Sequence, residues 1–523
     1  MSPDLQPLLL DALLCGGAVL LLLADLVLPD EKKSALADVT ALLLVGLFAA
    51  SFAVDTSGSA FSGAYVGSAW TLFFKRLFFA GGALTALGLR DFVAQRFPHR
   101  QGEFYLILVS CLLGMSILPG AQNLILLMVA FELMGLPLSV LAAWAKTEDT
   151  KGQDRDAAEA GLKLYIVGAA STAVTFFGLS LVYGATGSID LATMGAAAPT
   201  PLLVIGLFFV LAGMGFKIGA VPFHMWVPDT YQGAATPFVA FLSVAPKAAG
   251  FAALCALFLR AFGASQALWG PALLVVITLT LVVGNLMAIP QQNVKRLLAF
   301  SGVAHIGYML IALAIGTTEA RGVLLFYLAG YTVTNLGAFF VVGAVAGKDA
   351  DVEMVSFNGL SRRSPGLAAC LLIFLLSLAG IPFVVGFWAK VYIFLEAYRA
   401  GLWWLVLLGS LLAVVGLWYY LQVAYAAYIR PPAADREAPV VVDGRTRLAI
   451  GVCLIMVIGM GAYPRPFIDG ALEAGKALGP VATATAAPAN TTAAAANTVP
   501  SGNPTIAQPK VLAPFSGRVL QLR

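Results

Sequence analysis

Five charged side chains interrupt stretches of this sequence that are otherwise apolar enough to cross a membrane: Glu132, Lys163, Lys217, Lys247 and Lys390. A charged side chain at the centre of a bilayer costs at least about 2.5–3.5 kcal/mol on insertion scales. A chain that carries several such groups is expected to use them. Ammonium and carboxylate groups held away from water are suited to taking up and releasing protons, so proton transfer is the chemistry that these residues suggest.

Glu132 lies in LLMVAFELMGLPLSVLAAW, a run whose only other polar side chain is Ser139. An isolated carboxylate in hydrocarbon becomes neutral, whereas a nearby ammonium group keeps it ionised. Lys217 lies near the centre of its own span, as Glu132 does, so we predict that the two form a pair. A static pair that only fixes helix packing is the alternative.

Lys163 and Lys247 differ in predicted depth. Lys163 is about four residues from the acidic end of its span, so it either snorkels to the surface as an anchor or supports a proton path. Lys247 lies deeper, in ATPFVAFLSVAPKAAGFAAL. Because burial disfavours the charged form of a lysine, Lys247 is suited to loading and releasing a proton near physiological pH.

The three histidines complete the groups that titrate near neutrality. His99 lies in the loop FPHRQGE and is expected to be solvated. His224 and His305 lie in or next to spans, where either proton relay or a hydrogen-bonded core position fits. Lys75 and Arg76, in TLFFKRLFFAGG, come close to the end of their span, where snorkelling is the expected role.

Motifs for cofactors are missing from the sequence. It has no GxGxxG motif after a strand, no P-loop and no haem or iron–sulfur cysteine spacing. The five cysteines stand singly in apolar segments, and the histidines have no ligand-spaced Cys, Asp or Glu nearby, so we expect no metal site. Any energy that drives proton movement is therefore expected to come from a partner.

The composition indicates a polytopic membrane protein, because 60% of the residues are hydrophobic, 11% are charged and the mean hydropathy is +0.89. A spanning helix needs about 20 apolar residues. Fourteen such segments are predicted, centred near residues 18, 45, 80, 112, 134, 170, 211, 248, 280, 306, 333, 376, 412 and 456. The first follows a stretch without Lys, Arg or a cleavage site, so it is interpreted as a span and not as a signal peptide.

The loops between these spans differ in charge when they are assigned alternately to the two sides. One side holds Lys32, Lys33, Arg90, Arg96, Arg100, Lys146, Lys151, Arg155, Lys295, Arg296, Lys348, Arg362, Arg363, Arg430, Arg436, Arg445 and Arg447, and the other holds Arg260, Arg321 and Arg399. The positive-inside rule makes the first side cytoplasmic and predicts that both termini face outward. The same rule explains the basic residues without nucleic acid as a partner.

Two spans contain glycines followed by a proline: FVLAGMGFKIGAVPFHMW, with Pro222, and LLSLAGIPFVVGFWAK, with Pro382. Proline removes a backbone donor and clashes with the preceding turn, so both helices should break. The predicted topology gives the two spans opposite directions, as in the inverted repeats of secondary transporters, whose broken helices meet at the midplane. Glycine and proline are also commoner in membrane helices generally, which is the alternative explanation.

The chain changes character beyond about residue 470, where Ala, Thr, Pro and Asn dominate. Such a segment buries too little apolar surface to offset the entropy of ordering, so we expect disorder to about Pro509. The final VLAPFSGRVLQLR is more apolar and is interpreted as a frayed end, with docking on a partner as the alternative.

Several motifs in order carry a family resemblance. The stretch FKIGAVPFHMWVPDTYQGAATPFVAFLSVAPKAAG (216–250) resembles the signature of the antiporter-like subunits of respiratory complex I, the proton-pumping NADH:quinone oxidoreductase. ELMGLPLSVL, NLMAIPQQNVKRLLAFSGVAHIGYML and LSLAGIPFVVGFWAKVYIF extend it over roughly residues 100–430. Tyr231 and the GLKLY run at 161–165 make the chain most similar to subunit N, the counterpart of mitochondrial NADH dehydrogenase subunit 2.

The resemblance implies an all-α fold of fourteen transmembrane helices, with helices 4–8 and 9–13 as inverted five-helix repeats and helices 7 and 12 broken. In the family a glutamate of helix 5 pairs with a lysine of helix 7, which match Glu132 and Lys217. The central lysines of helices 8 and 12 match Lys247 and Lys390, and a lysine at the latter position argues against subunit M, where glutamate is usual. Supporting positions of the family match Lys163, His224 and His305.

The resemblance also implies domains and partners. The expected divisions are a three-helix segment (1–100), two repeats (101–262 and 263–430), a last helix (431–469) and a tail (470–523). FMN, iron–sulfur clusters, NADH and quinone would be bound by partner subunits, and subunits M, K and J would be neighbours in a bacterial inner membrane.

Two short runs depart from the family pattern: GAATP (233–237) in place of GAPTP, and GIPFVVGF (380–387) in place of GIPPTAGF. Each change alters a site near a helix break without removing a titrating group. The expected function is proton translocation coupled to redox chemistry elsewhere. A subunit of a multisubunit cation/proton antiporter and a passive scaffold are the alternatives.

Overall fold

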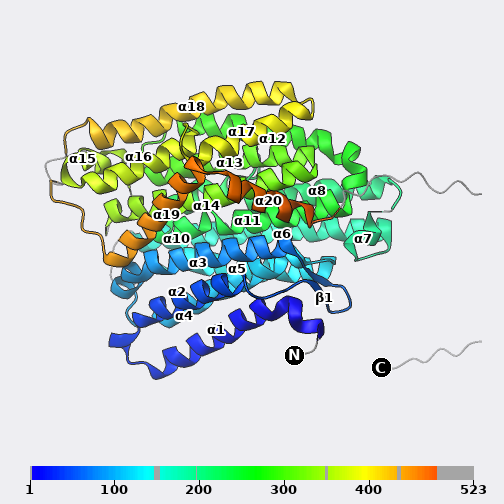
Figure 1. Ribbon diagram of the computed structural model, residues 1–523, viewed down its shortest axis with the longest axis horizontal. Coiled ribbons are helices and arrows are strands. Elements are labelled where there is room, and N and C mark those ends of the chain that lie inside the picture. The colour runs from blue at the N-terminus through cyan, green and yellow to red at the C-terminus, as the bar shows by residue number, and fades with distance from the viewer. Residues whose placement is uncertain (1–2, 146–152, 196, 348–351, 433–436, 480–523) are drawn as a thin grey trace, which may run out of the picture. The chain divides into compact units, whose positions relative to one another are not determined.

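The computed structural model describes residues 3–145, 153–195, 197–347, 352–432 and 437–479, and these are almost entirely helical (Figure 1). Among the described residues, twelve helices are long and apolar enough to cross a membrane. The class predicted from the sequence, an all-α polytopic membrane protein, is therefore confirmed. Two shorter apolar helices, Ala35–Ala50 and Pro365–Ala379, lie at the positions of two further predicted spans; the number fourteen stays a prediction.

The first part of the chain contains three long helices and one β-hairpin. Its elements are η1 (Pro3–Leu8), α1 (Leu9–Val27), η2 (Asp30–Lys32), α2 (Ala35–Ala50), β1 (Gly58–Ala60), β2 (Tyr65–Gly67) and α3 (Ala69–Arg96). The strands pair in antiparallel fashion. Ser68 starts α3 by a capping box, in which its side chain accepts from the Thr71 backbone amide and the Thr71 hydroxyl accepts from the Ser68 amide.

The middle of the chain carries four of the five charged residues that interrupt apolar segments. Its elements are α4 (Gln101–Ile117), η3 (Leu118–Gly120), α5 (Leu124–Ala142), α6 (Gln153–Thr186), α7 (Leu191–Met194), α8 (Pro201–Ile218), α9 (Trp226–Gly233), α10 (Thr236–Leu242), α11 (Ala245–Leu254) and the π-helical η4 (Cys255–Ala261). Glu132 lies on α5, Lys163 on α6, Lys217 on α8 and Lys247 on α11.

The last part carries Lys390 on α17. Its elements are η5 (Gly263–Ser265), α12 (Gln266–Ala288), α13 (Val294–Ile315), α14 (Thr318–Ala346), η6 (Met354–Phe357), α15 (Leu360–Arg363), α16 (Pro365–Ala379), α17 (Val385–Arg399), α18 (Trp403–Tyr428), α19 (Gly444–Ala462) and α20 (Arg465–Lys476).

Two helix breaks have the same backbone geometry. α8 ends at Gly219 (φ 81°, ψ 35°) and α16 ends at Gly380 (φ 87°, ψ 35°). At each, the amide after the glycine donates back to a carbonyl five residues earlier, from Ala220 to Gly215 and from Ile381 to Leu376. The left-handed conformation favours glycine because it has no Cβ. Both breaks predicted from the Gly–Pro pattern are therefore present.

A second feature also occurs twice. Asn123 caps α5 and forms a β-bridge with Asp190, just after α6; Asn293 caps α13 and forms a β-bridge with Glu353, just after α14. Two backbone hydrogen bonds flank each bridge, at 2.9 and 2.9 Å in the first and 2.8 and 2.7 Å in the second. The first bridge lies beside α7 and the second leads to α15, which are at opposite ends of the helices in Figure 1.

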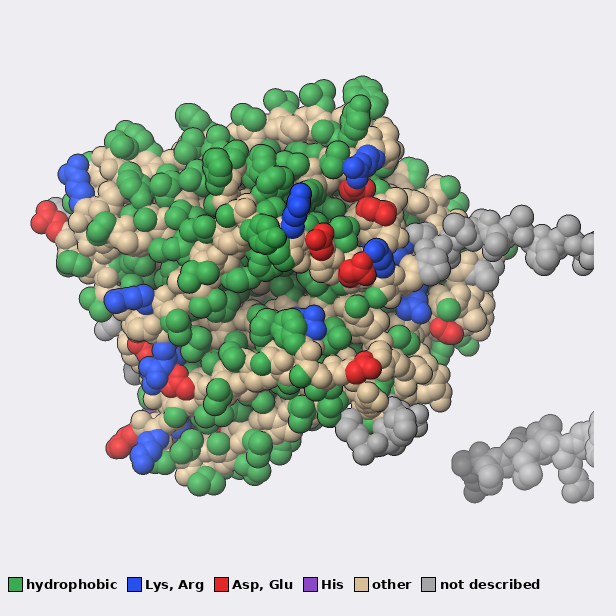
Figure 2. Space-filling model, in the orientation of Figure 1, with side chains coloured by type: hydrophobic (Ala, Val, Ile, Leu, Met, Phe, Trp, Pro, Cys, Tyr) green, Lys and Arg blue, Asp and Glu red, His purple; other side chains and the backbone are tan. Residues whose placement is uncertain are grey.

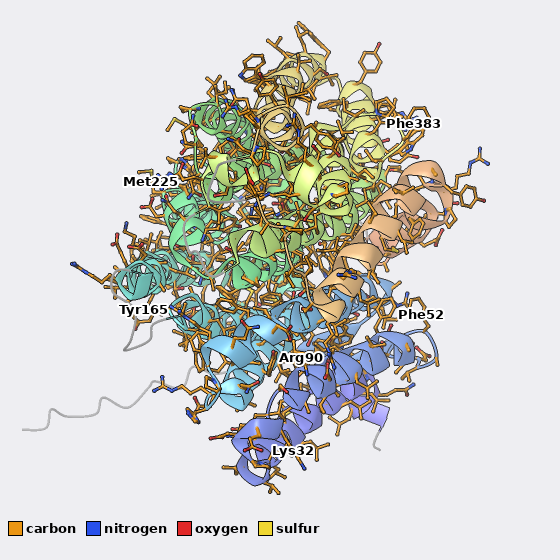
Figure 3. All side chains as sticks on the ribbon, turned by 90° about the vertical axis from the view of Figure 1, so that its left-hand side faces the viewer. Lys32, Phe52, Arg90, Tyr165, Met225 and Phe383 are labelled. Atoms are coloured by element: carbon orange, nitrogen blue, oxygen red, sulfur yellow. The ribbon has the colours of Figure 1, made fainter. Side chains whose placement is uncertain are left out.

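One end of the helices is held by ion pairs between distant segments and is called the basic end here. Arg445 donates to both oxygens of Asp38 at 2.6 and 2.8 Å, and Arg90 donates to Asp38 at 3.3 Å. Figure 3 views the helices from this side and labels Lys32 and Arg90. In the neighbouring loop, His99 and then Lys33 hold the pKa of Asp30 below its usual range by hydrogen bonding.

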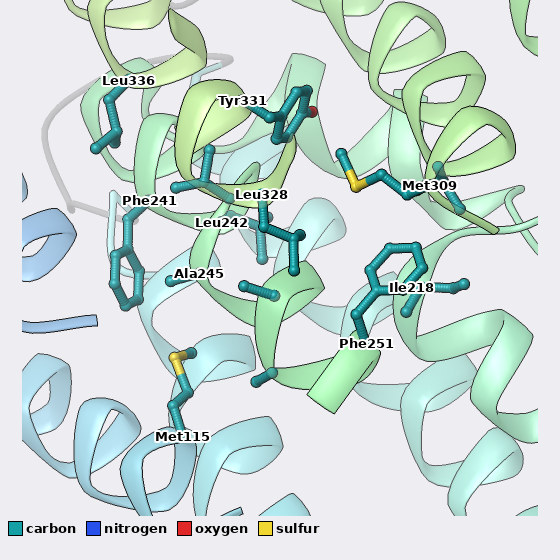
Figure 4. Close-up of a cluster of buried hydrophobic side chains, with 14 of the residues drawn as sticks. Met115, Ile218, Phe241, Leu242, Ala245, Phe251, Met309, Leu328, Tyr331 and Leu336 are labelled. Atoms are coloured by element: carbon teal, nitrogen blue, oxygen red, sulfur yellow. The ribbon is translucent and has the colours of Figure 1, made fainter. Parts of the chain in front are cut away.

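The core between the helices is apolar and the outer surface is apolar as well. Figure 4 shows Met115, Phe241, Ala245 and Phe251 among the buried side chains around α10 and α11. Figure 2 shows that most of the visible face is also covered by hydrophobic side chains, as expected where lipid is the solvent.

The first residues of the predicted tail are helical. α20 continues to Lys476, beyond residue 470, and it packs on α14, where Gly475 lies against Gly322. Ile468, Ala471 and Ala474 are buried, so this segment has enough apolar surface to order. The rest of the predicted tail, from residue 480, lies outside the described residues.

Candidate functional site

Glu132 and Lys217 face one another across α5 and α8, with Lys217 Nζ 3.6 Å from Glu132 Oε1. Thr172 of α6 donates to the same Glu132 oxygen at 2.8 Å. Lys217 Nζ also lies 5.4 Å from the centre of the Phe131 ring. The pairing predicted from the depth of the two charges is therefore observed as a contact.

The pair lines a cavity of about 400 Å³ between α5, α6 and α8. Its walls reach Trp226 and Pro246, the residue before Lys247. Tyr165, also in the wall, lies at the edge of the helices in Figure 3. A cavity of this size with charged walls has room for several water molecules, each of which takes about 30 Å³ of liquid volume.

The break after α8 is braced by side chains. The Trp226 indole donates to the Phe216 carbonyl at 3.0 Å, which satisfies one of the open carbonyls at the helix end. The Val221 amide is bound by the Thr280 hydroxyl oxygen at 3.0 Å. The first bond holds the last turn of α8 against the start of α9, and the second holds the linker after α8 against α12.

Lys247 is buried, with 2% of its surface exposed. Its ammonium donates to the Tyr331 hydroxyl of α14 at 3.3 Å. Asn335 donates to the same hydroxyl at 3.1 Å and to Ser243 at 2.8 Å. The ammonium also lies 5.6 Å from the ring centre of Tyr231 and of Tyr331, so its observed partners are neutral hydroxyl and ring groups.

His305 stands between Lys247 and Lys390 in a cluster of tyrosines. Its Nδ1 lies 2.8 Å from the Tyr327 hydroxyl and its Nε2 lies 3.3 Å from the Tyr420 hydroxyl. The Tyr420 hydroxyl also hydrogen-bonds Ser301, and the His305 and Tyr331 rings are 5.2 Å apart. The histidine is therefore both buried and hydrogen-bonded on two sides.

Lys390 binds the open carbonyl groups at the second helix break. Its ammonium donates to the carbonyls of Leu378 and Ala379, at 2.9 and 2.8 Å, at the C-terminus of α16. The negative end of a helix dipole favours a cation at this place. Lys390 Nζ is also 5.2 Å from the centre of the Tyr308 ring, which is packed beside His305.

Two of the supporting candidates lie apart from these contacts. Lys163 forms ion pairs with Glu159 (2.6 Å) and with Asp229 (3.0 Å), which also binds Arg296. The lysine is 42% exposed, as expected for an anchor at the end of a span. His224 lies in the linker between α8 and α9, where its ring is 6.2 Å from Phe300 and its Nδ1 has no hydrogen-bond partner among the described residues.

The expected snorkelling of Lys75 is wrong. Lys75 is 1% exposed, and its ammonium lies 2.5 Å from Asp11 Oδ2 of α1, whose other oxygen accepts from Ser116 at 2.6 Å. Arg76 is half-buried on Ser51 and on the Phe52 ring. Asp11 lies in the first span, LLLDALL, and its charge in an apolar run was the available signal that Lys75 needed a buried partner.

The sequence analysis also missed the neutral partners of the charged groups: Thr172, Tyr331, Asn335, Tyr327 and Tyr420. Polar side chains in apolar spans were the available signal. Among the described residues, there is no group of three or more His, Cys, Asp or Glu that could hold a metal ion.

Comparison with known proteins places the chain in a family. The family described as "NADH:quinone oxidoreductase/Mrp antiporter, TM" matches residues 121–416. The chain is 39% identical over 458 residues to NADH-quinone oxidoreductase subunit N of Moorella thermoacetica, covering 87% of this chain and 94% of that one.

Solved structures agree in fold. A chain of respiratory complex I from Thermus thermophilus is 34% identical, with a TM-score of 0.74 over 88% of this chain and 99% of that one. A chain of the Mrp complex from Dietzia sp. has a TM-score of 0.79 over 91% and 97%, but at 18% identity it is alike in fold alone. The chain belongs to the NADH:quinone oxidoreductase/Mrp antiporter family, as a member of its subunit N group.

Proposed function

We propose that this chain translocates protons as subunit N of an NADH:quinone oxidoreductase, and that Glu132, Lys217, Lys247 and Lys390 carry them. The Glu132–Lys217 pair supports this most strongly, because an ion pair 3.6 Å long lines a cavity within apolar helices. Such a pair is costly to keep in a membrane. Its position next to a helix break gives it a means to open and close.

The first step is a change in the Glu132–Lys217 pair. Opening it alters the energy of the Lys217 proton by about 4 kcal/mol at an effective dielectric constant of about 20. Moving one charge against 100 mV costs about 2.3 kcal/mol. A single ion pair is therefore sufficient to lift one proton against a working membrane potential.

The second step carries the proton along the midplane. The cavity beside Lys217 reaches Pro246, so a proton carried by water in it would come as far as the residue before Lys247. Lys247 then passes the proton toward His305 and Lys390 through the tyrosine cluster around Tyr331. Lys390, bound to open carbonyls at a break, is the outlet of the second half.

His305 fits a direct part in this path, because its two ring nitrogens bind two hydroxyls. Lys163 and His224 have supporting parts. Lys163, through Asp229, steadies α9 behind the break. His224 lies in the linker itself, so its role is to fix the position of the break.

Two inverted repeats explain the doubled features. The proposed repeats are 101–262 and 263–430, preceded by a three-helix segment (1–100) and followed by a last helix (431–469). Their support is that the bridge at Asn123 has a counterpart at Asn293, and the break at Gly219 has a counterpart at Gly380. The two bridges lie at opposite ends of the helices (Figure 1), as an inverted pair requires.

Partner subunits and the membrane complete the proposed complex. FMN, iron–sulfur clusters, NADH and quinone are bound by partner subunits, and subunits M, K and J are the proposed membrane neighbours. The chain sits in the bacterial inner membrane, and the basic end faces the cytoplasm, since Arg90 and Arg445 lie there. Both termini then lie on the periplasmic side.

A cation/proton antiporter is the second candidate, because the Dietzia Mrp chain has the same fold. The two are distinguished by purifying the tagged chain in mild detergent. Complex I predicts that flavin, iron–sulfur absorbance and NADH:quinone reductase activity co-purify with it. Co-purification of membrane subunits alone, with sodium/proton exchange and no flavin, would assign the chain to the antiporter.

A further inference from the structure

The three lysines Lys217, Lys247 and Lys390 each lie against a glycine. A Cβ atom added at Gly302 of α13 would lie 2.6 Å from Lys247 Nζ and 3.0 Å from the Tyr331 hydroxyl. One added at Gly135 of α5 would lie 3.3 Å from Lys217 Nζ. One at Gly380 would lie 2.8 Å from Lys390 Cδ. In each case the space beside the glycine is taken by the lysine.

Backbone geometry explains Gly380, whose φ is 87°, but not the other two. Gly302 and Gly135 lie inside helices and outside the positive-φ region. Glycine inside a helix is less favourable than alanine, because it loses more backbone freedom on folding. The benefit of glycine at these two positions is therefore the space that it leaves for the lysine ammonium group.

The repeated architecture gives Gly302 a particular place. It lies nine residues after the cap Asn293, and Glu132 lies nine residues after the equivalent cap Asn123. One half of the chain thus has a carboxylate facing Lys217 at this position, whereas the other half has a glycine against the Lys247 ammonium. The contrast fits a paired lysine in one half and a lysine bound to neutral groups in the other.

We propose that Gly302 and Gly135 are positioning residues, which leave the space that keeps the ammonium groups of Lys247 and Lys217 at their partners. The proposal rests on the proposed role of these lysines in proton transfer. A methyl group at residue 302 displaces the Lys247 ammonium from Tyr331, because the end of a lysine moves more easily than a helix. At residue 135 the overlap is smaller, so the displacement is smaller.

The test compares Gly302→Ala, Gly135→Ala and a matched control, Gly82→Ala. A Cβ at Gly82 of α3 would lie 2.7 Å from Leu112 Cδ1, which gives the same degree of overlap with the end of an apolar side chain. Each variant is purified as the whole complex and reconstituted in vesicles. Protons pumped per NADH oxidised are then measured against pH, per assembled complex.

Gly302→Ala is expected to slow proton pumping per assembled complex about tenfold or more and to lower the protons pumped per NADH, since a displacement of about 1 Å at reacting groups costs up to about 100-fold in rate. Its pH profile should also move away from that of the wild type, which a purely structural effect would not cause. Gly135→Ala should lose less, and Gly82→Ala should match the wild type.

Three results would overturn the proposal: an unchanged yield and pH profile in Gly302→Ala, a larger loss in Gly135→Ala than in Gly302→Ala, or failure of Gly302→Ala to assemble when Gly82→Ala assembles. Lys247→Ala in the same series separates this proposal from the proposed function. If Lys247→Ala pumps normally, the relay is wrong; if it fails to pump and Gly302→Ala pumps normally, only the positioning role is wrong.

Discussion

Lys217 Nζ lies 3.6 Å from Glu132 Oε1 at the wall of a cavity, and this ion pair differs from the buried Lys75–Asp11 pair. The Lys75–Asp11 contact is 2.5 Å long, and its side chains are 1% and 5% exposed, whereas those of Lys217 and Glu132 are 13% and 31% exposed. The two charged groups of a partly solvated ion pair can separate, whereas those of a short, buried pair stay in contact. Of these two pairs, Glu132–Lys217 is therefore suited to movement and Lys75–Asp11 to fixing helices.

The Asp11–Lys75 pair is expected to stabilise the fold without taking part in pumping. Removing one member of a buried pair leaves an uncompensated charge and costs about 3–5 kcal/mol. Asp11→Asn or Lys75→Met alone should therefore reduce the amount of assembled complex, and Asp11→Leu with Lys75→Met should restore part of it. Native gels measure assembly, and pumping per assembled complex should stay at the wild-type level. A loss of pumping in the well-assembled double variant would contradict this role.

Thr172 is expected to hold the Glu132 carboxylate in position opposite Lys217, because its hydroxyl donates to that carboxylate at 2.8 Å. A hydrogen bond to a charged group contributes about 1.5–3 kcal/mol. Thr172→Val should therefore lower proton pumping about tenfold or more. Thr278→Val is the control, since the Thr278 hydroxyl bonds a carbonyl of its own helix. Equal effects of the two variants would show that the hydroxyl of Thr172 has no special part.

Tyr331 is expected to matter through its hydroxyl group. Tyr331→Phe keeps the ring and removes the atom to which Lys247 donates at 3.3 Å, so proton yield per NADH should fall. Tyr105→Phe is the matched control, because the buried Tyr105 hydroxyl has no hydrogen-bond partner among the described residues. That variant should be as stable as the wild type or more so. Normal pumping by Tyr331→Phe would remove this residue from the path.

Replacing Gly380 with alanine is expected to have two effects, whereas the same change at Gly316 is expected to have one. Both glycines end a helix in the left-handed conformation, with φ 87° and 72°, so alanine at either costs about 1–2 kcal/mol. The thermal midpoint of activity loss should fall similarly in both variants. Only Gly380→Ala should also lower pumping, since its Cβ would lie 2.8 Å from Lys390 Cδ. An equal loss of pumping in Gly316→Ala would point to strain as the common cause.

The sequence predicted some of these features for clear physical reasons. A charge in an apolar run needs a partner at its own depth, and hydropathy gives depth, so Glu132 could be matched to Lys217. The glycines before Pro222 and Pro382 marked both helix breaks, because those residues limit the backbone directly. These signals are local and can be read along the chain.

The features that were missed depend on tertiary contacts. Lys75 and Asp11 are 64 residues apart, and depth alone could not show that the lysine turns inward. α20 orders because it finds a close-packed partner in α14 at Gly322, which composition does not reveal. The neutral partners of Lys247 were missed for the same reason, since many tyrosines lie in spans and only the fold selects Tyr331.

The central claim is that the midplane charges carry protons, and the proton-to-electron ratio of the Lys217→Ala complex tests it most directly. The variant is purified as an assembled complex, reconstituted in sealed vesicles and supplied with NADH and quinone. The account predicts that proton uptake per NADH drops and that quinone reduction slows with it, because the pair with Glu132 is lost. Wild-type values for both quantities would contradict the account.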